Sequence, residues 1–79
     1  MDEEKEDRKV IREKVEFFMN NKIMVHLETR DNKFYNGIFT KQISKNVYLI
    51  QERILGYTHI FISDIKSIET YLPKESKNE

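Results

Sequence analysis

The stretch that decides the fold is GYTHIFISDIKSIETYLP, residues 56–73. Apolar residues recur at short intervals on both sides of Ser63 and Asp64, which is typical of strands with one buried face. Serine and aspartate are common turn residues because their side chains can bond nearby backbone amides. The pattern predicts a strand, a two-residue corner at Ser63 and Asp64, and a second strand. The aliphatic markers are Ile60, Ile62, Ile65 and Ile68.

The segment upstream predicts one helix followed by three strands. Residues 10–19 (VIREKVEFFM) have apolar side chains at helical spacing, and we expect the asparagines after them to end the helix. From residue 23 the apolar residues alternate, which predicts a strand, a turn over residues 29–33 and a second strand over 34–40. Residues 41–46 break the pattern, and 47–52 resume it.

Gly37 lies inside the second predicted strand, where glycine usually marks a bulge or a sharp bend. The connections are too short for parallel crossovers. The sequence therefore predicts a mostly β fold: an N-terminal helix followed by a five-stranded, strongly bent antiparallel sheet or small open barrel.

Length and composition limit the function. The 79 residues suit one small domain, expected over 9–73 between disordered charged segments at 1–8 and 74–79. The chain has no cysteine, so neither a disulfide nor a thiolate zinc site stabilises it. No apolar run approaches the length of a membrane span and the first residues are acidic, so we expect a cytoplasmic or nuclear protein. The net charge is zero, which does not favour nucleic-acid binding.

Two motifs resemble those of the Sm and Sm-like (LSm) family. VHLETRDNKFYNGIF, residues 25–39, is similar to the first motif of the family, with Gly37 as the bend glycine and Phe39 as the large apolar residue after it. GYTHIFISDIKSIE, residues 56–69, resembles the second motif. The end of the chain is also similar to the divergent, Gemin-type Sm-fold proteins of the SMN complex, which pair with another Sm-fold protein. The resemblance implies the Sm-like open barrel.

The departures from the family pattern concern RNA binding. RNA-binding members carry Asp-x-x-Met-Asn in one loop and Arg-Gly at the later corner, whereas this chain offers Asn46 alone in the first and Ser63 and Asp64 in the second. An aspartate near a bound phosphate would be repelled by about 4 kcal/mol at about 4 Å and an effective dielectric of about 20. We therefore expect the corner to have a structural role.

The favoured hypothesis is a non-enzymatic interaction module. The resemblance implies that the fourth strand of one subunit pairs with the fifth strand of its neighbour, and both strands are rich in β-formers here. The partner would be another Sm-like protein in a ribonucleoprotein assembly complex of the snRNP or SMN type. The predicted interface residues are Tyr57, Ile60, Ile62, Ile65 and Ile68.

Other functions are weighed against this one. An RNA-binding subunit of an LSm or Hfq-like ring is the alternative, and its candidate RNA contacts are Lys41, Lys45, Asn46 and His59. A small barrel outside the family that shares the strand pattern is the third possibility. His59, Ser63 and Asp64 do not suggest a catalytic triad, because no glycine-rich oxyanion loop accompanies them. His26 and His59 lack a third metal ligand at a suitable spacing. We expect no enzyme, cofactor, metal or small-molecule substrate.

Overall fold

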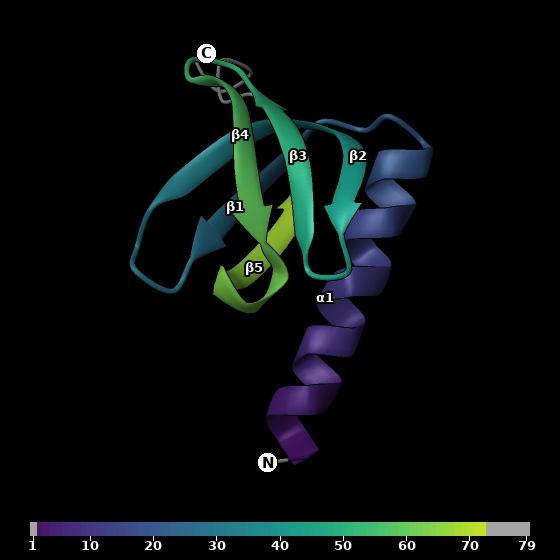
Figure 1. Ribbon diagram of the computed structural model, residues 1–79. Coiled ribbons are helices and arrows are strands. Elements are labelled where there is room, and N and C mark those ends of the chain that lie inside the picture. The colour runs from purple at the N-terminus through teal and green to yellow at the C-terminus, as the bar shows by residue number, and fades with distance from the viewer. Residues whose placement is uncertain (1, 73–79) are drawn as a thin grey trace.

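The computed structural model describes residues 2–72, and the side chains of residues 8–72. It has one N-terminal helix and one sheet of five antiparallel strands in the order β4-β3-β2-β1-β5, so the sheet is open, with β4 and β5 at its two edges (Figure 1). The predicted mostly β class is confirmed. The elements are α1 (Asp2–Asn20), β1 (Val25–Thr29), β2 (Phe34–Ser44), β3 (Val47–Glu52), β4 (Gly56–Phe61), the 3-10 turn η1 (Ile62–Asp64) and β5 (Ile65–Thr70).

Helix α1 is longer than predicted. It begins at Asp2, so helix continues through most of the segment expected to be disordered, and its first turns extend past the sheet (Figure 1). Glutamate, lysine and arginine are good helix formers, so the helix extends into the charged N-terminal segment, where no apolar pattern predicts it. Residues 74–79, also expected to be disordered, lie outside the described residues. No helix in the described part of the chain is long and apolar enough to cross a membrane.

The C-terminal end of α1 is a Schellman motif. The amide of Ile23 donates to the carbonyl of Phe18 at 3.0 Å, and the amide of Lys22 donates to that of Met19 at 3.2 Å. The left-handed residue is Lys22, with φ 54°, and not one of the two preceding asparagines as the sequence suggested.

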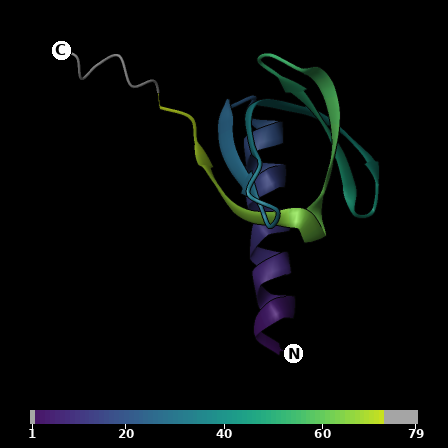
Figure 2. The same ribbon diagram turned by 90° about the vertical axis from the view of Figure 1, so that its left-hand side faces the viewer.

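The core lies between α1 and the concave face of the sheet (Figure 2). The helix contributes Ile11 and Val15, both buried at the predicted helical spacing. The hydroxyl of Tyr48, whose side chain is buried, donates to Glu16 Oε2 at 3.0 Å. Burial, and secondarily this hydrogen bond, raise the pKa of Tyr48. The sheet contributes the buried residues Val25, Leu27, Phe39, Tyr48, Ile50, Ile60, Ile65 and Ile68.

Gly37, expected to mark a bulge or a sharp bend, lies at a close approach between β2 and β3, and the register shifts of β2 come after Phe39. It is the one residue of β2 that pairs with both neighbours, facing Val25 of β1 and Glu52 of β3. A Cβ atom at this position would lie 2.2 Å from the backbone oxygen of Gln51, so no other residue fits without moving a strand. The predicted interruption over residues 41–46 is much shorter, because β2 continues to Ser44 and absorbs two register shifts before a two-residue turn.

Candidate protein-interaction edges

The outer edge of β4 carries unpaired backbone groups. In the described chain β4 pairs with β3 alone, and just after β4 the amide of Ile62 donates to the carbonyl of Asn46 at 2.9 Å. Antiparallel pairs alternate between hydrogen-bonded and non-hydrogen-bonded positions, so the backbone groups of Thr58 and Ile60 face β3. Those of Tyr57, His59 and Phe61, which occupy the alternate positions, face away from the sheet.

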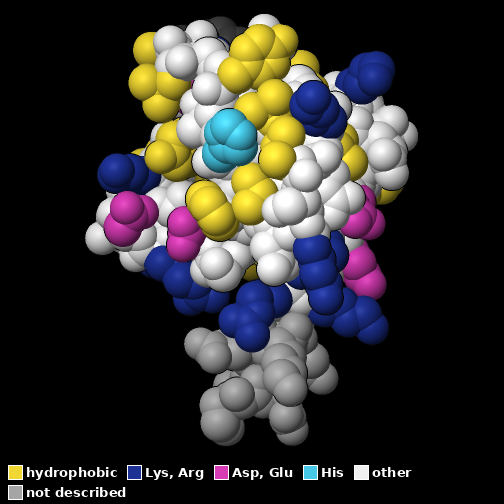
Figure 3. Space-filling view, viewed as in Figure 1, with side chains coloured by type: hydrophobic (Ala, Val, Ile, Leu, Met, Phe, Trp, Pro, Cys, Tyr) yellow, Lys and Arg dark blue, Asp and Glu magenta, His cyan; other side chains and the backbone are white. Residues whose placement is uncertain are grey.

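The side chains of the same three residues form an exposed surface of two aromatic rings and one imidazole. Tyr57 is 65% exposed, Phe61 is 49% exposed, and His59 lies exposed between them. On β3, Tyr57 faces Gln51, His59 faces Leu49 and Phe61 faces Val47. Figure 3 shows hydrophobic side chains gathered around a histidine on the face that carries β3 and β4. Since β4 contains no Lys, Arg, Asp or Glu, this edge lacks the charges that usually prevent strand association.

The edge formed by β5 is better protected. The amide of Tyr71 donates to the carbonyl of Met24 at 2.9 Å, so by alternation the outward backbone groups belong to Ile68 and Thr70. The pairing with β1 shifts register beside Thr29, and the exposed Lys66 at this irregularity lies 3.8 Å from a carboxylate oxygen of Glu28. A bulge and a lysine are common protections of a strand edge.

The predicted interface residues lie on the two edge strands and the corner between them, but only one of their side chains is exposed. Tyr57 is on the outer surface, whereas the four isoleucines are buried in the core, at 0–4% exposure. Substitutions at these isoleucines, Ile62 included, would therefore report on folding and not on pairing. Phe61 was not among the predicted interface residues, although the alternation of Ile60 and Ile62 places Phe61 on the outer face.

The predicted RNA contacts do not form one cluster. Lys41 of β2, Leu49 of β3 and His59 of β4 lie in one cross-strand row, so Lys41 and His59 are separated by one strand. Lys45 and Asn46 form the β2–β3 turn, where Arg12 Nη2 donates to Asn46 Oδ1 at 2.7 Å. His26 lies on β1, separated from β4 by both β2 and β3, and no group of three potential metal ligands occurs among the described residues.

The corner between β4 and β5 is held differently from the prediction. Arg30 donates its Nε to the carbonyl of Ser63 at 3.0 Å and its backbone amide to the carbonyl of Asp64 at 2.8 Å. Among the described hydrogen bonds, none uses the side chain of Ser63 or Asp64. Ser63 and Asn46 line one open hollow of about 510 Å³ together with Arg8 and Phe61.

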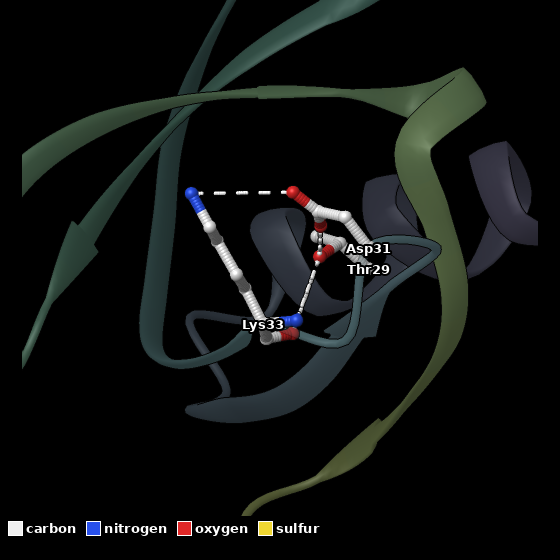
Figure 4. Close-up of polar contacts among 3 residues, drawn as sticks. All are labelled: Thr29, Asp31 and Lys33. Atoms are coloured by element: carbon white, nitrogen blue, oxygen red, sulfur yellow. Dashed lines mark hydrogen bonds and ion pairs between the residues drawn. The ribbon is translucent and has the colours of Figure 1, made fainter.

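The turn between β1 and β2 is ordered by a compact set of polar contacts (Figure 4). The hydroxyl of Thr29 bonds Asp31 Oδ1 and accepts the backbone amide of Lys33 at 3.1 Å, and Lys33 Nζ lies 3.9 Å from Asp31 Oδ2. The bond from Thr29 lowers the pKa of Asp31. This confirms the turn predicted over residues 29–33.

A buried carboxylate holds the turn that leads into β4. Glu52 Oε1 accepts the amides of Ile54 and Leu55, both at 2.8 Å, and Oε2 accepts the amide of Asn36 at 2.9 Å. Burial of Glu52 raises its pKa, but the three backbone hydrogen bonds outweigh burial, and the pKa is lowered. This role of Glu52 was not predicted from the sequence, because a glutamate at the end of a strand has the pattern of an ordinary surface residue.

Comparisons of the chain with protein-family models, curated proteins and solved structures give no match. The fold and the site thus define a small open β-sheet domain whose described edge strand β4 is unpaired on its outer side and contains no Lys, Arg, Asp or Glu.

Proposed function

We propose that the chain is an Sm-like interaction module that pairs through its strand edges with another Sm-like protein in a ribonucleoprotein assembly complex. The observation that carries the proposal is the sheet order β4-β3-β2-β1-β5, which leaves free the two strands through which Sm subunits associate. The close approach of β2 to β3 at Gly37 and the N-terminal helix over the core are further features that support this fold.

The β4 edge supports this function most strongly. Three residues offer outward backbone donors and acceptors, and two of them add exposed aromatic side chains. Strand addition derives affinity from backbone hydrogen bonds and specificity from alternate side chains. Both requirements are met at β4 without any charge to be desolvated.

Co-expression with individual Sm-fold proteins tests the proposal. We expect one of them to co-purify with the tagged chain as a stable heteromer. Replacing Tyr57 and Phe61 by lysine should abolish the complex, because two ammonium groups would be placed at the pairing edge. The matched control is Ile54→Lys, since Ile54 is 86% exposed in the turn next to β4 and has no outward strand groups. A complex that survives the double substitution, or no complex with any Sm-fold protein, would contradict the proposal.

An RNA-binding ring subunit is a second candidate, favoured by one contact. The β2–β3 turn and the β4–β5 corner, which carry the nucleotide pocket in RNA-binding members of the Sm family, touch through the hydrogen bond from Ile62 to Asn46. Arg8 lines the hollow beside them. Fluorescence anisotropy with short uridine-rich and adenine-rich RNAs tests this candidate, which requires binding that is lost in Asn46→Ala or His59→Ala.

A further inference from the structure

The β4 edge is complementary to itself. Its outward backbone groups belong to Tyr57, His59 and Phe61, so an aromatic residue lies at equal distance on each side of His59. We propose that β4 pairs antiparallel with β4 of a second copy of this chain, about a two-fold axis at His59. Tyr57 then faces Phe61 of the second copy, and His59 faces His59. This contact goes beyond the proposed function, because it needs no Sm-like partner.

The number of backbone bonds favours β4 with β4 over β4 with β5. Three facing pairs, each exchanging two hydrogen bonds, give about six bonds across the two-fold axis. The β5 edge has regular outward positions only at Ile68 and Thr70, which limits pairing with β4 to about four bonds. The amide of Ile65 is already bonded to the carbonyl of Ile62, and Lys66 lies at the register shift.

Side chains and surroundings also fit a second copy. The two-fold arrangement makes two Tyr57–Phe61 cross-strand pairs on one face, and directly opposed aromatic residues stabilise antiparallel pairs. β4 contains no lysine, arginine, aspartate or glutamate, and the one basic side chain that meets its own copy at the axis is the imidazole of His59. A hollow of about 240 Å³ lies beside the edge, lined by Asp31 and Lys33 of the β1–β2 turn together with His59 and Phe61.

Single cysteines test the register directly, because the chain has none of its own. Facing residues of a hydrogen-bonded antiparallel pair have Cα atoms about 5.5 Å apart, within disulfide range. We expect His59→Cys to form a covalent dimer under mild oxidation. Tyr57→Cys and Phe61→Cys are the matched controls, since each lies about 14 Å from its own copy across the axis. Neither should cross-link alone, but a mixture of the two should.

The mass in solution completes the test. Light scattering should give twice the chain mass of 9.6 kDa for the native protein and a fall to the monomer mass for Phe61→Lys, with circular dichroism showing that the variant is folded. A monomeric native protein, or His59→Cys linking no faster than Tyr57→Cys, overturns the inference. If the chain binds an Sm-fold protein but His59→Cys forms no covalent dimer, the proposed function stands and this inference is wrong. If His59→Cys forms the dimer but no Sm-fold protein binds, this inference stands and the proposed function is wrong.

Discussion

The ionised carboxylate of Glu52 holds the turn that positions β4. Its carboxylate accepts three backbone amides while 7% exposed, so Glu52→Gln places an amide group against a backbone donor and should lower the free energy of unfolding at pH 7 by about 1–3 kcal/mol. Urea unfolding of both proteins measures the difference.

The pH dependence of that difference has a definite sign. Because the pKa of Glu52 is lowered in the folded state, its stabilisation is present above the unfolded value of about 4.3 and is lost as the pH falls through the folded pKa. The gap between native protein and Glu52→Gln should therefore narrow below about pH 4. A gap that stays constant from neutral to acidic pH would show that ionisation of Glu52 contributes nothing.

Gly37 and Gly56 require glycine for different structural reasons. Gly37→Ala forces a Cβ against the backbone of Gln51 and should destabilise the fold by about 1–3 kcal/mol or more. Gly56 has open space around it but a φ of 83°, so Gly56→Ala should cost about 1–2 kcal/mol through backbone strain alone. Thermal unfolding measures both losses, and a Gly37→Ala protein as stable as the native one would contradict the close approach of β2 to β3 at this position.

At the scale of elements, a substitution at the C-terminal end of α1 can stabilise the fold. Lys22 occupies a left-handed conformation that glycine adopts without strain, so Lys22→Gly should raise the free energy of unfolding by about 0.5–1 kcal/mol. Lys14→Gly, within the helix, is the opposite control and should lower it by about 1 kcal/mol. If both changes destabilise equally in chemical denaturation, the Schellman ending is wrong.

Sequence patterns predicted most elements because buried apolar residues recur with the period of the helix or strand that carries them. Ile11 and Val15 marked the buried face of α1, and Ile60 to Ile68 marked both edge strands. The patterns failed where burial was not involved. The charged start of α1 has no apolar period. The last five residues of β2, which include its extension to Ser44, are exposed.

At the scale of the whole molecule, the candidate edges followed from topology more than from residue identity. The sequence located β4 and β5 as edges through a resemblance, yet it assigned the interface to isoleucines that fill the core. Which backbone groups face outward depends on the pairing phase, fixed here by the bond from Ile62 to Asn46. Long-range contacts such as Glu52 with Asn36 and Arg30 with Ser63 leave no periodic signal in the sequence.

The most direct test of β4 as the association edge is residue-resolved amide hydrogen exchange, measured in the dilute chain and in its complex with an Sm-fold partner. In the dilute chain the amides of Thr58 and Ile60 should be protected by β3, while those of Tyr57, His59 and Phe61 exchange rapidly. In the complex all five should be protected. If Tyr57, His59 and Phe61 exchange as rapidly in the complex as in the dilute chain, β4 is not the strand that binds the partner.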